Sequence, residues 1–83
     1  MKGYEMAGKT RRDSNNVSLE KLIEEYGLTN DMVAAMTGYS VNSVKAWRAR
    51  DVESAKYRPM QDRAMKLLEF EIKNRKLKAF VNM

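Results

Sequence analysis

The chain contains no cysteine, no histidine and only one proline among its 83 residues. Without cysteine it forms no disulfides, and without cysteine or histidine it lacks the usual zinc ligands and the thiolate nucleophile. A calcium or magnesium site made of carboxylates alone would need a run of closely spaced acidic positions, and no such run is present. We therefore expect a domain held by packing alone, with no metal and no cofactor.

Long apolar runs are also missing. No segment approaches the roughly 18 apolar residues that a membrane span requires. The first residues, MKGYEMAGKTRRDSNN, have no apolar stretch after their lysine, so no secretory signal is expected. Because the lack of cysteine also fits a reducing compartment, these features predict a cytoplasmic protein without a membrane partner.

Groups suited to catalysis are equally scarce. Acid–base catalysis near neutral pH usually depends on histidine or a buried carboxylate, and serine or threonine nucleophiles need a neighbouring base. The acidic residues here fall on the polar faces of amphipathic segments, and no glycine-rich phosphate loop is present. We expect neither an enzyme nor a site for a small-molecule ligand.

Basic residues outnumber acidic ones, 16 to 11, which gives a net charge of +5. A basic chain attracts polyanions, and phosphate backbones are the commonest of these in cells. A charge of +5 is also normal for the solubility of a small domain. Charge alone therefore leaves a nucleic-acid partner open.

The first third of the chain predicts an arm followed by a helix. Residues 1–16 are rich in glycine, serine and asparagine and have no hydrophobic period, which is typical of a flexible basic arm. Ser18 suits the N-cap of a helix that Gly27 ends. The apolar face of this helix consists of Leu19, Leu22, Ile23 and Tyr26.

Two short helices are expected next. Thr29 suits the N-cap of a helix over residues 30 to 36 or 37, and Gly38 ends it. Ser40 then caps a helix over residues 41 to about 50. The pattern is a pair of short helices separated by a turn that contains glycine.

The last part of the chain predicts a loop and a long helix. Residues 51–57 have no period, and Pro59 suits the first position of a helix that runs to about Lys76. The apolar stripe of that helix is Met60, Ala64, Leu67, Leu68 and Ile72. Since no strand-like alternation occurs, we expect an all-α, compact domain of four to five helices.

The tryptophan and several methionines occupy positions that predict core residues rather than binding residues. Trp47 lies three residues after Val44 on the apolar side of its helix, so we expect a core residue rather than an exposed base-stacking ring. The methionines at or beside helix-packing positions are expected to fill the core or its edge. These are Met32, Met36, Met60 and Met65.

The stretch NDMVAAMTGYSVNSVKAWR has a characteristic spacing of small and apolar residues. Ala34 is followed by Gly38 after four residues and by Val44 after six more, with Val33 before and Trp47 beyond. This spacing resembles the helix-turn-helix of lambda-repressor and Cro-like proteins. YRPMQDRAMKLLE resembles the family's exit loop and following helix. In its size and its YRP element, the chain resembles small phage-encoded repressors, including those associated with anti-CRISPR operons.

The resemblance covers roughly residues 18–72 and has one departure. Thr37 stands where the family usually has a large aliphatic residue, so either Met36 supplies that contact or the helix is slightly rotated. We expect a flexible arm over residues 1–16, a helix-turn-helix domain over 17–76, and a tail or dimerisation extension over 77–83.

The resemblance implies a sequence-specific regulator of transcription that binds double-stranded DNA, a small repressor whose second motif helix enters the major groove. The base-reading residues would be Val41, Asn42, Lys45 and Ala46. Asn42 matches the donor and acceptor pair of adenine, the two apolar residues suit a thymine methyl, and Lys45 can reach guanine or phosphate.

Phosphate contacts are expected from residues that flank this helix: Thr29, Asn30, Ser40, Ser43, Arg48, Arg50, Lys56, Tyr57 and Arg58. Some of these have a second interpretation. Ser40 is a helix cap, Tyr57 can pin the loop to the core, and Arg48 and Arg50 can be solvated surface residues. Lys9, Arg11 and Arg12 of the arm either enter a minor groove or have no role.

A second copy of the chain is the other expected partner, because one helix reads too few base pairs for useful specificity. Leu77, Phe80 and Val81 predict a C2 dimer, whereas a frayed basic tail is the alternative for residues 77–83. The alternative function is a helical adaptor that binds a host protein through the helix after Pro59 and keeps the motif as a scaffold. The expected location of the DNA-binding protein is the nucleoid, in a host cytoplasm if a phage encodes it.

Overall fold

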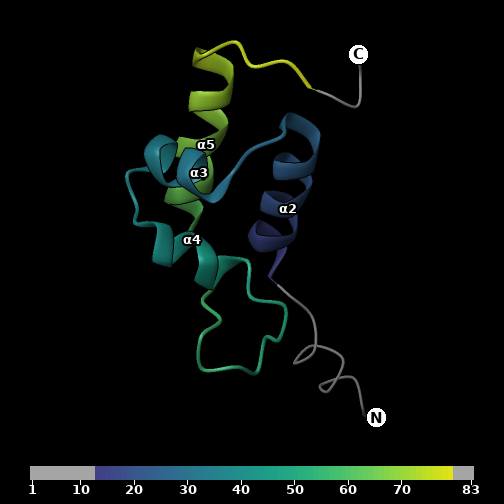
Figure 1. Ribbon diagram of the computed structural model, residues 1–83, viewed down its shortest axis with the longest axis vertical. Coiled ribbons are helices and arrows are strands. Elements are labelled where there is room, and N and C mark those ends of the chain that lie inside the picture. Colours follow the sequence, from purple (N-terminus) through teal and green to yellow (C-terminus); the bar gives the residue numbers. More distant parts are fainter. Residues whose placement is uncertain (1–12, 80–83) are drawn as a thin grey trace.

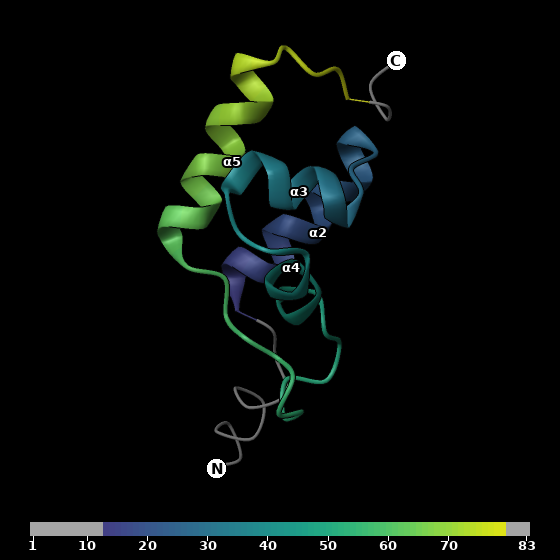
Figure 2. The ribbon, with the colours of Figure 1, turned by 60° about the vertical axis from the view of Figure 1, so that its left-hand side comes forward.

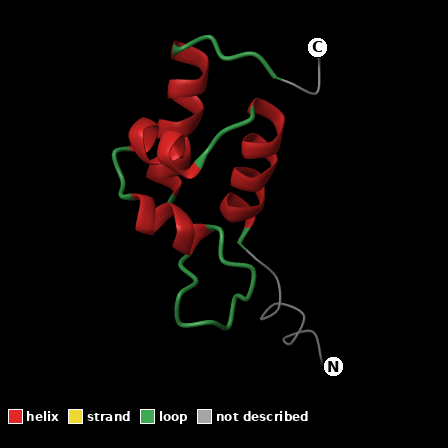
Figure 3. Cartoon of the chain, viewed as in Figure 1, coloured by secondary structure: helices red, strands yellow, loops and turns green. Residues whose placement is uncertain are grey.

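The computed structural model describes residues 13–79, which form four α-helices. These are α2 (Ser14–Tyr26), α3 (Asn30–Thr37), α4 (Val41–Trp47) and α5 (Asp62–Asn74). The described residues contain no strand (Figure 3). The all-α prediction is confirmed. None of these helices is long and apolar enough to cross a bilayer.

α3 is the central helix, which packs on both α4 and α5, while α2 packs on α5. Figure 1 looks nearly along α3 while α4 lies across the view, and Figure 2 looks along α4 while α3 lies across it. The two short helices therefore cross steeply. The loop after α4 extends from one end of the molecule, beyond α4 (Figure 1).

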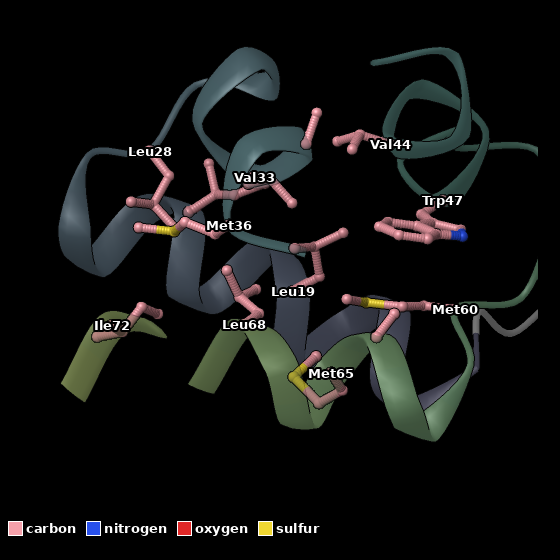
Figure 4. Packing of buried hydrophobic residues seen from close by; sticks show 13 residues of the cluster. Leu19, Leu28, Val33, Met36, Val44, Trp47, Met60, Met65, Leu68 and Ile72 are labelled. Carbon is pink, nitrogen blue, oxygen red and sulfur yellow. The ribbon is translucent and has the colours of Figure 1, made fainter. Parts of the chain in front are cut away.

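The core lies between the four helices, with Leu19 near its centre (Figure 4). Trp47 is buried in it, as the spacing predicts, and so are Met36, Met60 and Met65. Met32 is the exception, since 36% of its surface is exposed. Its predicted place in or near the core is wrong because the helical rotation that buries Val33 turns the preceding residue outward.

The caps of both short helices and the stop of the first one are confirmed. The Thr29 hydroxyl accepts a hydrogen bond from the Met32 N–H at 3.1 Å, and the Ser40 hydroxyl accepts one from the Ser43 N–H at 3.0 Å. Gly38 ends α3 with φ of +79°. A Cβ added there would have no atom within 4 Å, so the backbone angle, not lack of space, calls for glycine.

Thr37, the departure from the family pattern, is buried at the end of α3. Its hydroxyl donates to the Val33 carbonyl at 2.8 Å, which satisfies the polar group inside the helix. Met36, the preceding residue, belongs to the apolar core. A hydroxyl can therefore replace an aliphatic group here without an unpaired polar atom.

The N-cap of the first helix lies five residues before the expected Ser18. Asp13 is its N-cap residue, so residues 14–16 of the predicted arm are helical. The side chains of Asn15 and Asn16 form hydrogen bonds across the domain, which hold this first turn in place. Residues 1–12, with Lys9, Arg11 and Arg12, lie outside the described residues.

α4 ends at Trp47 rather than near Arg50. The Trp47 carbonyl accepts from the Asn16 side-chain amide at 2.8 Å, and the Ala46 carbonyl accepts from the Arg58 N–H at 3.2 Å. These carbonyls would otherwise bond to the next turn of helix. Tertiary hydrogen bonds therefore terminate α4 early.

α5 begins at Asp62, three residues after the expected Pro59. The Met60 N–H donates to Asn16 Oδ1 at 2.8 Å, and the Met60 carbonyl accepts from Asn15 Nδ2 at 3.0 Å. The Met60 carbonyl is thus held by Asn15 instead of a later N–H of the helix, and the first helical residue is Asp62. α5 ends at Asn74 instead of Lys76, which has a positive φ of 57°.

Asn16→Ala is expected to lower the free energy of unfolding by about 3 kcal/mol, since it removes three hydrogen bonds to backbone groups, two of them buried and one part-buried. Urea denaturation monitored by circular dichroism measures this. Ser18→Ala, at an exposed position of the same helix, is the control and should change stability by less than about 0.5 kcal/mol. Equal stability of the two variants would contradict the assigned role of Asn16.

Candidate nucleic-acid interface

α4 buries one face and exposes the other. Val44 and Trp47 point into the core, where the Trp47 ring meets Tyr39 edge-on with centroids 5.1 Å apart. Asn42 and Lys45 are exposed and Ala46 is half-buried. Three of the four predicted base-reading residues therefore share the accessible side of the helix.

Val41, the fourth predicted base-reading residue, is half-buried and packs against the core. It lies on the first turn of α4, directly after the Ser40 cap. Because part of its side chain contacts the core, it offers less surface to a partner than Asn42 does.

A concavity of about 520 Å³ lies between α4 and the loop that follows it. Asn42, Lys45 and Ala46 line it from the helix, and Lys56 and Arg58 line it from the loop. The fold thus brings three predicted base-reading residues together with two predicted phosphate-binding residues. Ala49 and Ala55, which the sequence did not single out, also line it. Their small side chains leave the concavity open.

Tyr57 and Arg58 make hydrogen bonds that shape the loop. The Tyr57 hydroxyl donates to Asp13 Oδ2 at 2.9 Å and accepts from the Asp13 N–H at 3.1 Å. Arg58 Nη1 donates to the carbonyls of Ala55 and Tyr57, at 2.6 and 2.8 Å. Tyr57 therefore ties the loop to Asp13 at the start of α2, rather than to the core as the second interpretation expects, and Arg58 closes the loop on itself.

The predicted hydroxyl contacts are also engaged locally. Thr29 and Ser40 act as helix caps, and Ser40 additionally donates to the Ser43 hydroxyl at 3.1 Å. All three lie at the starts of the two short helices. Their caps fix these helix ends, and a phosphate contact would be an additional role.

Arg48 is directed toward α2 and α3, away from the concavity. Its Nε and Nη2 donate to the two carboxylate oxygens of Glu20, at 2.9 and 3.2 Å, and its Nη1 donates to Asn30 Oδ1 at 2.7 Å. The three side chains come from different parts of the chain. Arg48 is therefore neither simply solvated nor open toward a partner, and it links Asn30, another predicted phosphate-binding residue, to the acidic Glu20.

Besides Arg58, the exposed cations around α4 are Lys45, Arg50 and Lys56. Within residues 13–79 none of these three forms a side-chain hydrogen bond or ion pair. Lys45 and Arg50 also line a second, more polar depression of about 470 Å³, together with Glu20, Asn30 and Arg48. Concave surface with basic side chains therefore lies on two sides of α4.

The sequence reasoning missed several residues that position this surface. Asn16, Glu20 and the hydrogen bond from the Tyr39 hydroxyl to Gln61 Oε1, at 2.6 Å, hold α4 and its flanking segments. Their partners lie 22 to 31 residues away in the chain. No local spacing could signal such pairs.

The predicted dimer extension is only partly described. Leu77 packs against the protein's own core, while Phe80 and Val81 lie outside the described residues. Phe70, on α5, is 60% exposed, more than the other exposed large apolar residues of the described chain. The sequence reasoning did not single it out.

Within residues 13–79 no group of three or more acidic side chains is placed to hold a metal ion. Comparisons with protein-family models, with curated proteins and with solved structures found no match. The functional interpretation therefore depends on the geometry and chemistry of the surface around α4.

Proposed function

We propose that the protein is a sequence-specific regulator of transcription, of the small repressor kind, that inserts α4 into the major groove of double-stranded DNA. The observation that carries the proposal is the placement of Asn42, Lys45 and Ala46 on the accessible face of α4, beside basic residues of the following loop. A major groove about 12 Å wide admits one helix and its side chains.

The form of the α3–α4 pair supports this proposal. The two short helices cross steeply and are joined by residues 38–40, so α3 can brace the DNA backbone while α4 enters the groove (Figure 2). α4 is only seven residues long, or about 10 Å. Its exposed residues would contact the edges of a few base pairs.

The local charge supports it as well. Residues 41–58 contain five basic and two acidic residues, a net charge of +3. A positive surface around the inserted helix is the electrostatic pattern of a DNA-binding protein. Because Asn42 is exposed and makes no side-chain hydrogen bond within residues 13–79, its amide is available to pair with adenine.

We expect duplex binding to weaken steeply with salt. Three exposed cations, Lys45, Arg50 and Lys56, would release counterions, and each phosphate contact lowers log K by about 0.9 per decade of salt. The slope should therefore be about −2.7 per protomer, or roughly 40-fold weaker binding between about 50 and 200 mM salt. Fluorescence anisotropy with duplexes selected from random DNA measures it. A flat salt dependence would favour an adaptor.

Asn42→Ala should reduce discrimination at one base pair per half-site by about 1–3 kcal/mol. Lys56→Ala should instead weaken selected and random DNA alike, because a phosphate contact carries no sequence information. Both side chains are exposed, so the fold is expected to persist. Competition binding with single-base variants of the selected site measures both effects. Identical behaviour of the two variants would place the reading helix elsewhere.

The proposal includes a C2 dimer on a pseudo-palindrome with half-sites about 10 base pairs, or roughly 34 Å, apart. Phe70, exposed on α5, is the apolar side chain through which we expect the two copies to pack. Phe70→Ser should convert the dimer to a monomer in sedimentation at micromolar concentration. Lys66→Ser, at an exposed position one turn earlier, is the control. A wild-type monomer both free and on DNA would refute the dimer.

The exposed Phe70 also favours the second candidate function, an adaptor that binds a host protein through α5. An adaptor needs no affinity for duplex DNA. The salt experiment therefore separates the two functions, since an adaptor would show a flat salt dependence and no selected sequence.

A further inference from the structure

The cluster formed by Glu20, Arg48 and Asn30 joins three helices at one side of α4. Glu20 belongs to α2, Asn30 begins α3, and Arg48 directly follows α4. The guanidinium of Arg48 bonds to both oxygens of the carboxylate and to the amide oxygen of Asn30. The charged side chains are about one-third exposed, so the cluster lies at the surface.

Arg48 determines which way the Asn30 amide faces. A guanidinium has only donor groups, so the amide must present its oxygen to it. The NH2 group then points to the opposite side. No residue among 13–79 accepts a hydrogen bond from this NH2 group, so both of its donors are available to a ligand.

The surroundings of the cluster suit an anion. Asn30, Arg48 and Glu20 line the 470 Å³ depression together with Lys45 and Arg50. One acidic and three basic side chains give it a net charge of +2. Because the carboxylate is paired in a bidentate way, its charge is compensated before an anion approaches.

From this arrangement we infer that Arg48 is a positioning residue, which holds the Asn30 amide with its NH2 group toward one phosphate of the DNA backbone. The inference rests on the proposed function and concerns the side of α4 away from the loop. Arg48 does not contact the phosphate. Its guanidinium is already bound to both oxygens of Glu20 and to Asn30 Oδ1, so a phosphate contact would require these hydrogen bonds to break.

The position of the depression fits a duplex. Lys45 lines both this depression and the concavity that contains Lys56 and Arg58. The two concave surfaces therefore flank α4 on different sides. The two DNA backbones that border a major groove would each lie against one of these surfaces. Asn30 would contact the backbone on the side of α4 away from the loop.

The test uses the selected duplex with a single uncharged methylphosphonate placed at each backbone position in turn. Wild-type affinity should fall about tenfold at the phosphate that Asn30 binds. The affinity of Asn30→Ala should not change when the methylphosphonate is at that position, and it should still fall when the methylphosphonate is at the other contacted phosphates. Arg48→Gln should lose sensitivity at the same position, and the double variant should bind no more weakly than either single variant.

Asn30→Asp separates positioning from stability. The new carboxylate keeps the acceptor for Arg48, so the thermal midpoint should not fall, but it replaces the NH2 donor with an anion. Binding should weaken about tenfold or more, with sensitivity lost at the same phosphate. Glu20→Gln combined with Arg48→Gln keeps the experiment informative if Arg48→Gln alone unfolds, because it removes both charges of the ion pair together.

The results that overturn the inference are distinct. In the first, Arg48→Gln keeps its full loss of affinity when the methylphosphonate replaces the phosphate that Asn30 binds. In the second, it loses that effect at a different phosphate. Either result shows that Arg48 does not position Asn30. Lys56→Ala is the matched control and should lose sensitivity on the other strand only. If the wild-type chain binds no duplex at all, the proposed function fails, an outcome separate from the first two.

Discussion

The side chain of Asn16 is the contact on which the arrangement of α4 and its loop depends. It is fully buried, and its amide donates to the carbonyls of Trp47 and Arg58 while its oxygen accepts from the Met60 N–H. These partners lie at the end of α4 and at the return of the loop. One side chain thus fixes both ends of the loop that carries Lys56. Buried polar groups satisfied in this way specify one arrangement, because any other leaves them unpaired.

The parts of the fold that the sequence predicts are those with local causes. Thr29 and Ser40 cap the helices that follow them, and Gly38 ends the first of the pair with a positive φ. Each of these interactions spans four residues or fewer. The faces of α4 were predictable for the same reason, since the burial of Val44 and Trp47 follows from helical spacing alone.

The features that could not be predicted depend on pairs far apart in the chain. Asn15 and Asn16 looked like part of a polar arm, yet their partners 42 to 45 residues away begin α2 early and delay α5. Glu20 looked like a solvated residue on the outer face of a helix, but it binds Arg48, 28 residues later. A composition argument counts Arg48 as a cation facing a partner, whereas its guanidinium is held by a carboxylate and an amide.

α2 determines how α4 is held, although the two are not neighbours in the sequence. A helix of seven residues is too short to be stable alone. Its apolar face is anchored by Val44 and Trp47, and its last turn is tied by Asn16 and, through Arg48, by Glu20, both on α2. These polar ties act at the end of α4 opposite to Asn42, so they restrain the helix without covering its exposed face. A helix fixed before binding loses little freedom on contact with its partner, which is the physical advantage that this arrangement gives the proposed reading helix.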